Sequence, residues 1–335
     1  MNRFQKVATG ALVAVILLIF VGAIVRVTGS GLGCPDWPKC WGCLIPPTSV
    51  EQVQLDDKTY EKIRAKGERR GMPAELLTRE KIKESFNPVH TWIEYINRLT
   101  SLPVGFLTLA TFIMSFQHKR SRPKVFVLAF LCLLNVLVNA WLGMQVVYSG
   151  LKPGIITLHM SLAFLLITLQ VYVAWRGTDS PWRLPLAEKI RPSQFWITIA
   201  LISLVVIEGI MGSQIREMTD ELARSHAGES RADWIGELEQ SSLYLVHRSF
   251  SWLIVIVSLL WFVRSRKARA GVSHWLEKSV MGIVGTMMLL GIVLAHIGIL
   301  PVVQVLHVGL TACLLALLVL AALASKEREL PNSHG

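Results

Sequence analysis

The sequence predicts an all-α integral membrane protein whose eight transmembrane helices form two pseudo-symmetric four-helix bundles. Three observations support this fold class. The 335 residues are 52% hydrophobic and only 17% charged, whereas soluble proteins carry about a quarter charged residues. Apolar runs of about 20 residues recur, which is the length that crosses a bilayer as a helix. The second half of the chain also repeats features of the first, which indicates an internal duplication.

Eight segments have the length and composition of a transmembrane helix. They are residues 7–27, 92–116, 124–147, 155–175, 194–213, 243–263, 278–298 and 301–324. A cleaved signal peptide is the alternative for the first segment. Because no clear small-residue cleavage site follows it and its apolar core is long, we expect a retained helix instead.

The distribution of basic residues predicts the orientation in the membrane. Lys and Arg are concentrated in the loops 118–124, 176–191 and 264–278, whereas the short loops 148–154 and 299–300 carry almost none. The loop 28–91 is basic yet expected outside, because long loops translocate largely regardless of charge. Basic loops stay in the cytoplasm, so we expect a multi-pass protein of the cell (inner) membrane with both termini cytoplasmic. These loops also explain the net charge of +11, so nucleic acid is not expected as a partner.

The internal duplication is clearest near the end of each half. The stretch 142–159 aligns without a gap with the stretch 290–307, at a constant offset of 148, and a histidine closes each of them. The organisation that we expect is an N-terminal half, a C-terminal half and a cytoplasmic tail: residues 1–176, 190–325 and 326–335.

The largest segment outside the predicted spans is the loop 28–91, which we expect on the external side. From residue 51 to residue 84, 17 of 34 residues are charged, so this part must lie in water or among lipid headgroups. Its apolar residues predict short amphipathic helices interrupted at Gly71-Met72-Pro73. The polar loop 214–242 of the second half has only a weak helical signal.

Three cysteines lie close together in the external loop. Thiols pair in an oxidising compartment, so we expect a disulfide, with Cys34 and Cys40 as the favoured pair. Cys43 either replaces one of them or stays free, and a metal bound by three thiolates is the alternative. Cys132 and Cys313 lie in spans and are expected to be small buried apolar residues.

Four ligand-type residues occupy related positions: Asn97 and His159 in the first half, His247 and His307 in the second. Each lies five or six residues into a span that begins outside, which places all four about 8–9 Å below the outer surface. A lone intramembrane histidine commonly only bonds a neighbouring helix. Two histidines at one depth and at repeat-related positions favour the axial ligands of a six-coordinate heme suited to electron transfer.

In the first half, asparagine replaces one of the two histidines. Because Asn97 is a poor iron ligand, an iron bound by His159 would keep an open position or take another sixth ligand. Glu94 shares a helix face with Asn97, and a carboxylate inside the membrane is expected to be functional. An open iron position beside a proton donor suits oxygen or peroxide chemistry. The alternative is that Glu94 only pairs with Arg98.

Two further charged residues lie near the second pair of histidines. Arg248 follows His247 and is expected to meet a heme propionate, the alternative being an arginine that reaches the membrane surface. Glu208 of the fifth span is expected to pair with Arg216 or with a neighbouring helix, and the alternative is a place on a proton path.

Taken together, these motifs resemble the heme A synthase family, and the resemblance covers essentially all eight spans. It is carried by residues 28–38 (TGSGLGCPDWP), 94–98 (EYINR), 158–160 (LHM), 246–248 (VHR) and 306–307 (LH). The resemblance implies that the C8 methyl of heme O is oxidised to a formyl group, by successive hydroxylations and loss of water. The product, heme A, would serve terminal oxidase assembly.

The resemblance also implies a role for each site residue. His247 and His307 would hold a heme b cofactor in the C-terminal half, and His159 would face the iron of heme O in the N-terminal half. Glu94 would be the essential acid. Asn97 departs from the family, which more often has histidine there.

The implied partners are heme O, the heme O synthase that supplies it, an electron donor and the terminal oxidase; a homo-oligomer is left open. The main alternative function is that of a diheme b-type electron-transfer cytochrome that oxidises quinol. A transporter with duplicated halves ranks last, because the ligand-type residues lie in the outer half of the bilayer rather than at its midplane.

Overall fold

The computed structural model of the protein describes residues 1–326 except 70, 188, 227, 270 and 299. Within this part of the chain the regular elements are helices, and no β-strand occurs. Eight helices are long and apolar enough to cross a membrane, which confirms the predicted fold class; the pseudo-symmetric arrangement of two bundles stays a prediction. They are α1 (Arg3–Val27), α4 (Pro88–Ser115), α5 (Pro123–Tyr148), α6 (Ile155–Arg176), α7 (Arg191–Ser225), α9 (Ser242–Lys267), α10 (Trp275–His296) and α11 (Pro301–Lys326). The predicted tail 326–335 lies outside the described residues, apart from Lys326.

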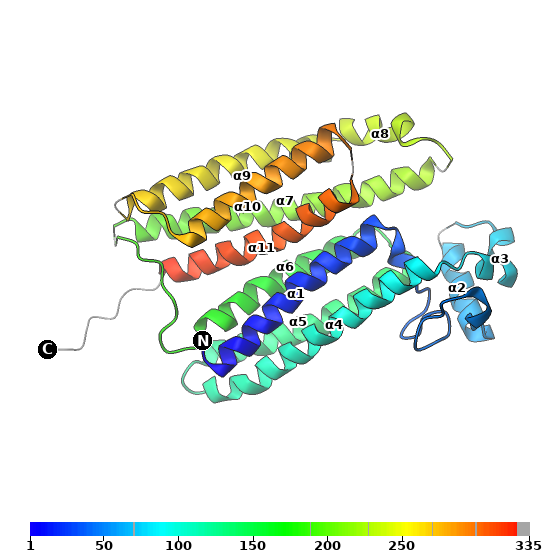
Figure 1. Ribbon diagram of the computed structural model, residues 1–335, viewed down its shortest axis with the longest axis horizontal. Helices are drawn as coiled ribbons and strands as arrows, with labels where there is room; N and C mark the ends of the chain where they lie inside the picture. The colour runs from blue at the N-terminus through cyan, green and yellow to red at the C-terminus, as the bar shows by residue number, and fades with distance from the viewer. Residues whose placement is uncertain (70, 188, 227, 270, 299, 327–335) are drawn as a thin grey trace.

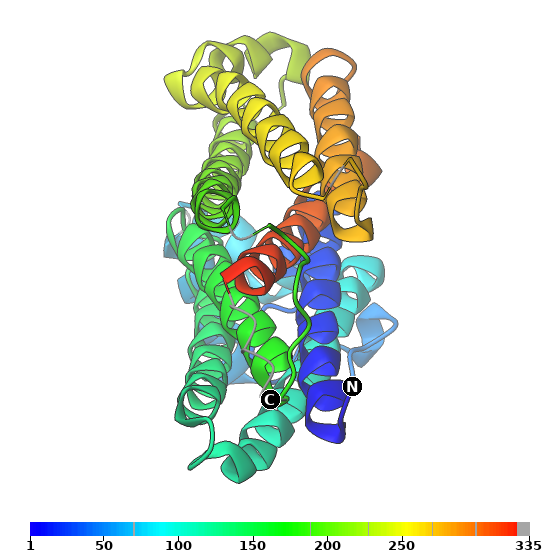
Figure 2. The same ribbon diagram turned by 90° about the vertical axis from the view of Figure 1, so that its left-hand side faces the viewer.

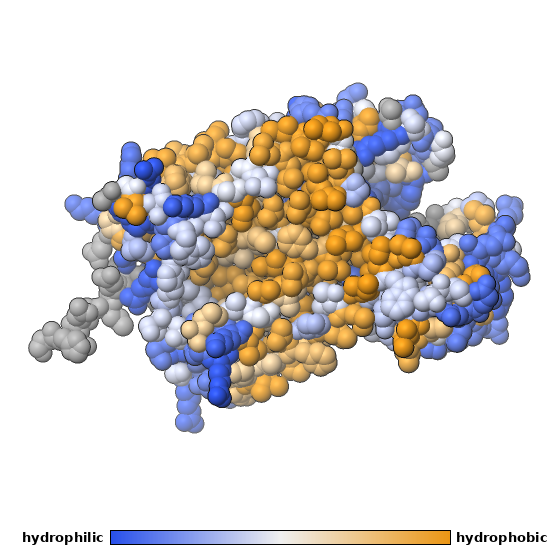
Figure 3. All heavy atoms as spheres, viewed as in Figure 1, coloured by the Kyte–Doolittle hydropathy of each residue, from blue (hydrophilic) through white to orange (hydrophobic). Residues whose placement is uncertain are grey.

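The long helices run alongside one another, with shorter helices at one end (Figure 1). These shorter helices are α2 (Asp57–Arg69), α3 (Arg79–Glu84) and α8 (Arg231–Gln240). The start of α1 and the end of α11 lie at the opposite end (Figure 1). Apolar side chains cover the middle of the molecule and hydrophilic ones gather at both ends (Figure 3). This surface is that of a protein which crosses a bilayer.

Helix α11 lies at the centre of the molecule. It packs against α1 and α6 and also against α7 and α10, and both ribbon views show it between these helices (Figures 1 and 2). Its residues belong to two apolar cores. Leu315 and Val319 join a core with α1, α4, α5 and α6, whereas Leu314 and Leu318 join one with α7, α9 and α10.

The contact between α1 and α11 is close at Gly309. A Cβ atom added there would lie only 2.1 Å from Cε1 of Phe20 on α1. The two helices therefore meet where one of them has no side chain, as is common for helices that pack within a membrane.

We expect Gly309→Ala to lower the thermal stability of the purified protein, because the added methyl group must displace Phe20. Overpacking of this kind typically costs about 1–3 kcal/mol. Thermal unfolding in detergent measures the effect, and Gly282→Ala is the matched control because an added Cβ there meets nothing within 4 Å. Phe20→Leu should recover part of the loss in the Gly309→Ala background, and an unchanged midpoint in Gly309→Ala would contradict the expectation.

Helix α7 is longer than the predicted span 194–213, because it continues through residues that were expected to form a loop. No glycine or proline interrupts the sequence from 214 to 225, and Arg216 pairs with Asp220 one turn later at 3.0 Å. The carboxylate of Glu217 on this extension accepts hydrogen bonds of 3.0 Å from the backbone N–H groups of Gly154 and Thr157. It thereby stabilises the N-terminus of α6.

The external loop contains the predicted amphipathic helices, here α2 and α3. The interruption predicted at residues 71–73 is also confirmed, since α2 ends before it and the 3₁₀ turn η3 (Ala74–Leu77) follows it. Gly71 has a φ of 72°, which glycine adopts without strain. The loop has a small apolar core of its own, in which Trp41, Val53 and Ile82 pack with Cys34 and Cys40.

Candidate functional site

The four ligand-type residues lie on four different long helices: Asn97 on α4, His159 on α6, His247 on α9 and His307 on α11. All four side chains are partly buried. Each has a buried polar atom without a hydrogen bond among the described residues, namely Oδ1 of the asparagine and Nδ1 of the histidines. Among these four atoms, Nδ1 of His247 lies 3.3 Å from Oε1 of Glu208 without a hydrogen bond.

His247 and His307 fit a heme iron through the Nε2 atoms of their rings. The two residues and Glu208 lie close enough to influence one another electrostatically. In the part of the chain that the structure describes, no hydrogen bond involves Nε2 of either ring. Neutral imidazole nitrogens are common axial ligands of heme iron, and two of them form a six-coordinate site.

A glycine on the preceding long helix faces each of these four residues. A Cβ atom added to Gly212 would lie 3.4 Å from Cε1 of His247, and the ligand-type side chain is likewise the nearest group to the other three glycines. The corresponding distances are 3.9 Å from Gly22 to Oδ1 of Asn97, 3.7 Å from Gly143 to Cε1 of His159 and 3.8 Å from Gly291 to Cε1 of His307. The same packing of a glycine against a ligand-type side chain thus occurs four times, whether that side chain is asparagine or histidine.

The packing of these four glycines against the ligand-type residues was not predicted from the sequence. Gly143 and Gly291 belong to the aligned stretches, so their equal spacing to the following histidine was the available signal. The backbone beside each imidazole keeps the same offset of 148, although it lies just before the aligned stretches. It is the backbone of Asn139 at His159 and that of Met287 at His307. His159 and His307 therefore have an equivalent glycine and an equivalent backbone neighbour. The pair in the first half differs from the pair in the second half because Asn97 takes the place of a histidine.

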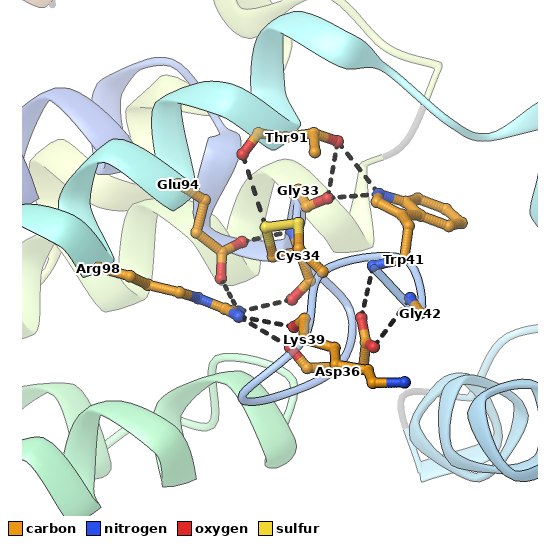
Figure 4. Close-up of a disulfide and its surroundings, with 10 residues drawn as sticks. Gly33, Cys34, Asp36, Lys39, Trp41, Gly42, Thr91, Glu94 and Arg98 are labelled. Atoms are coloured by element: carbon orange, nitrogen blue, oxygen red, sulfur yellow. Dashed lines mark hydrogen bonds and ion pairs between the residues drawn. A yellow bond between two sulfur atoms is a disulfide. The ribbon is translucent and has the colours of Figure 1, made fainter. Parts of the chain in front are cut away.

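Glu94 lies near the N-terminus of α4 and is buried. Its Oε1 accepts a hydrogen bond of 2.6 Å from Nη2 of Arg98, and its Oε2 accepts one of 2.7 Å from the backbone N–H of Cys34 (Figure 4). Both carboxylate oxygens are thus bound, one to the expected arginine and one to the external loop. Among the described residues, no hydrogen bond or ion pair joins Glu94 to His159.

Arg98 extends the same network into the external loop. Its guanidinium donates hydrogen bonds to the backbone carbonyls of Cys34 at 2.9 Å, Asp36 at 2.9 Å and Lys39 at 3.0 Å (Figure 4). The Asp36 carboxylate in turn accepts the N–H groups of Trp41 and Gly42 (Figure 4). Glu94 and Arg98 therefore tie the disulfide-bonded loop to the first turns of α4.

The favoured disulfide is confirmed, since Cys34 and Cys40 are bonded (Figure 4). Cys43 is free, and its backbone pairs with that of Cys40. Two of the three sulfurs are therefore not available as thiolates for a metal ion. In the spans, Cys132 is buried as expected, whereas Cys313 is only partly buried.

Peptide mapping without reduction is expected to recover Cys34 and Cys40 as one linked species, with Cys43 alkylated. A linked Cys40–Cys43 species, or alkylation of all three cysteines without reduction, would contradict this pairing. The disulfide closes a loop with a sequence separation of 6. So short a loop constrains the unfolded chain little, so we expect stabilisation below the typical range of about 2–4 kcal/mol.

Two other predicted residues lie near the second pair of histidines. Arg248 is exposed, and its Nη2 lies 3.5 Å from Nε2 of His296. Glu208 does not pair with Arg216, which binds Asp220 instead. It contacts the neighbouring helix α9, the other partner that was expected.

Comparison with known proteins identifies the family of the chain. Residues 5–319 match the family of cytochrome oxidase assembly proteins (COX15-CtaA). The chain belongs to this family.

Several relatives of the family are similar over most of the chain. The heme A synthase of Rhodospirillum centenum is 28% identical over 264 residues, which cover 73% of this chain and 67% of that protein. The heme A synthase of Brucella anthropi is 26% identical over 342 residues, which cover 92% of this chain and 87% of that protein. The family predicted from the motifs is thereby confirmed.

Proposed function

We propose that this protein is a heme A synthase, which oxidises the C8 methyl group of heme O to the formyl group of heme A. The main support is the match of residues 5–319 to the family of cytochrome oxidase assembly proteins and the similarity to heme A synthases. The two sites of this chain also differ. His247 and His307 offer two imidazoles, whereas His159 and Asn97 offer one imidazole and an amide. A heme A synthase needs a firmly held heme cofactor and an exchangeable heme substrate. Two imidazoles suit the cofactor, and one imidazole with an amide suits the substrate.

In the C-terminal half, residues 190–325, His247 and His307 would hold heme b. Heme b, when bound, supplies one-electron transfer. Nε2 of each ring makes no hydrogen bond among the described residues and would be the donor for iron. Arg248 lies one residue beyond His247 and is exposed, so its guanidinium is placed to bind a propionate from outside the bundle.

In the N-terminal half, residues 1–176, His159 would bind the iron of the substrate heme O. Asn97 can donate or accept a hydrogen bond there without binding iron strongly. Glu94 lies less than one helical turn from Asn97, and Arg98 and the Cys34 N–H hold its carboxylate in place. We propose that this carboxylate holds and releases a proton during the oxidation.

The proposed setting is the cell (inner) membrane, with both termini cytoplasmic and both heme sites toward the outer side. The proposed partners are heme O, a heme O synthase that supplies it, an electron donor and a terminal oxidase that receives heme A. The alternating basic loops support this orientation. The position of Glu94 and Arg98 beside the disulfide-bonded loop also supports it, because disulfides persist in oxidising compartments.

Extraction and chromatography of the hemes bound to the purified protein test the proposal. We expect heme B together with heme O and heme A. Heme B alone, in two equivalents and with both sites low-spin, would instead show the diheme cytochrome.

We expect Asn97→His to convert the substrate heme toward a six-coordinate low-spin state and to lower the yield of heme A. The new imidazole would occupy the position that asparagine leaves open to other ligands. Resonance Raman spectra and heme A yield from one preparation measure both effects. Asn97→Gln is the control, since it keeps an amide but adds no imidazole, and equal losses in both variants would indicate a steric effect instead.

A further inference from the structure

We propose that Glu208 and Gly212 of α7 form a positioning clamp for the imidazole of His247, in which Glu208 makes this ligand more electron-donating and lowers the reduction potential of heme b. The proposal rests on the proposed function to the extent that His247 binds a heme. The proposed oxidation of heme O gives no role to Glu208 or to Gly212.

The acid lies directly beside the ring. Glu208 is only 9% exposed, and its Oε1 lies 3.3 Å from Nδ1 of His247. The same Oε1 accepts a hydrogen bond of 2.5 Å from the hydroxyl of Ser251, one turn after His247 on α9. Ser251 is itself within 3.0 Å of the backbone carbonyl of His247. The carboxylate is thus held against the ring by the helix that carries the ligand.

Gly212 follows Glu208 by one turn and contacts the next atom of the same ring. An added Cβ would lie 3.4 Å from Cε1 of His247, closer than at any of the three related glycines. Nδ1 and Cε1 are bonded neighbours in imidazole, so α7 covers one edge of the ring. Nε2 lies beyond that edge and stays available to iron.

The charge of the carboxylate determines the electronic effect. A carboxylate at Nδ1 favours the tautomer that has its proton on Nδ1 and its lone pair on Nε2, and it raises the basicity of the ligand. A buried negative charge near iron also stabilises the more positive, oxidised state. Both effects favour oxidised over reduced heme b.

Among the three histidines, the ion-pair contact of 3.3 Å with a carboxylate is described at His247, whereas Glu208 acts on His307 only electrostatically. The imidazoles of His159 and His307 lie beside the backbones of Asn139 and Met287, which carry no net charge. Within the described residues, His159 forms no ion pair with a carboxylate, and the first-half acid Glu94 is bound to the external loop. We therefore expect Glu208 to act on heme b and to leave the substrate site unchanged.

Glu208→Gln tests the proposal because it keeps the shape and the acceptor oxygen but removes the charge. In redox titrations of the purified holoprotein, heme b should keep its low-spin spectrum. Its ratio of reduced to oxidised form at a fixed potential should rise at least tenfold, which for one electron corresponds to about 59 mV. Glu217→Gln is the matched control, since it neutralises another buried carboxylate of α7 that contacts α6 rather than a histidine.

Two further variants keep the test decisive if Glu208→Gln loses heme. Ser251→Ala removes the hydrogen bond that holds the Glu208 carboxylate against the ring, without neutralising the carboxylate. Because the carboxylate can then move away from Nδ1, the ratio of reduced to oxidised heme b should shift in the same direction by a smaller factor. Gly212→Val should alter the low-spin electron paramagnetic resonance signal by displacing the ring, whereas Gly212→Ala should change it little.

Unchanged potentials in Glu208→Gln and Ser251→Ala, or equal shifts in Glu208→Gln and Glu217→Gln, would overturn the clamp. Either result would leave the proposed function intact as long as the wild-type protein shows a bis-imidazole heme. Absence of that heme from the wild-type protein would overturn the proposed function first, so the two failures are distinguishable.

Discussion

Replacement of His247 or His307 by alanine is expected to abolish the low-spin heme signal of the protein and, with it, the formation of heme A. Each change removes one of the two proposed axial ligands, and alanine offers no donor atom in its place. Optical and electron paramagnetic resonance spectra of the purified variants measure the loss of heme b. Chromatography of extracted hemes from the same cells measures the loss of product.

His226→Ala is the matched control for both variants. This histidine lies at the end of α7, where its Nε2 is 3.2 Å from a carboxylate oxygen of Glu237, whose side chain is 57% exposed. Exposed ion pairs contribute little, so neither the heme signal nor the yield should change. A full bis-imidazole spectrum in His247→Ala or His307→Ala would show that the assigned ligand is wrong.

Glu94→Gln is expected to reduce heme A formation to background and to leave the heme b spectrum intact. The amide keeps nearly the same shape and can still accept the N–H of Cys34, but it cannot release a proton. The second site is built by α7, α9, α10 and α11, which do not carry Glu94. Heme A yield and the heme b spectrum of one preparation therefore separate a defect of the substrate site from general misfolding.

A loss of heme A in Glu94→Gln has two explanations, because the carboxylate also anchors the external loop. The double variant Cys34→Ser/Cys40→Ser loosens the loop and leaves the carboxylate in place. If this variant makes heme A and Glu94→Gln does not, the proton at Glu94 is what matters. Normal heme A yield from Glu94→Gln would remove Glu94 from the mechanism and leave it a structural partner of Arg98.

The parts of the fold that the sequence predicts are those determined by local composition. Hydropathy alone locates the eight spans, because a helix must bury every backbone polar group wherever it crosses lipid. The interruption of the external helices at Gly71 and the pairing of Cys34 with Cys40 follow from residue type and from spacing. Each of these predictions depends on only a short stretch of chain.

The parts that the sequence does not predict depend on contacts between helices. The extension of α7 was missed because Glu217 is stabilised by the N-terminus of α6, which lies 60 or more residues away in the chain. The contact of Glu208 with His247 and the binding of Arg98 to loop carbonyls are equally non-local. A polar residue in an apolar span shows that a partner exists, but the sequence does not identify the partner.

The close contact of Gly309 with Phe20 has a consequence for biosynthesis. Helix α1 precedes α11 by almost the whole described chain, and ribosomes add about 5–20 residues per second. A nascent chain therefore holds α1 in the membrane for tens of seconds before its partner is made. Until then the phenyl ring of Phe20 faces lipid or a chaperone, and a message truncated before α11 yields a product whose α1 never acquires this partner. In such a fragment the ring of Phe20 remains an apolar group on α1 without the helix that normally covers it.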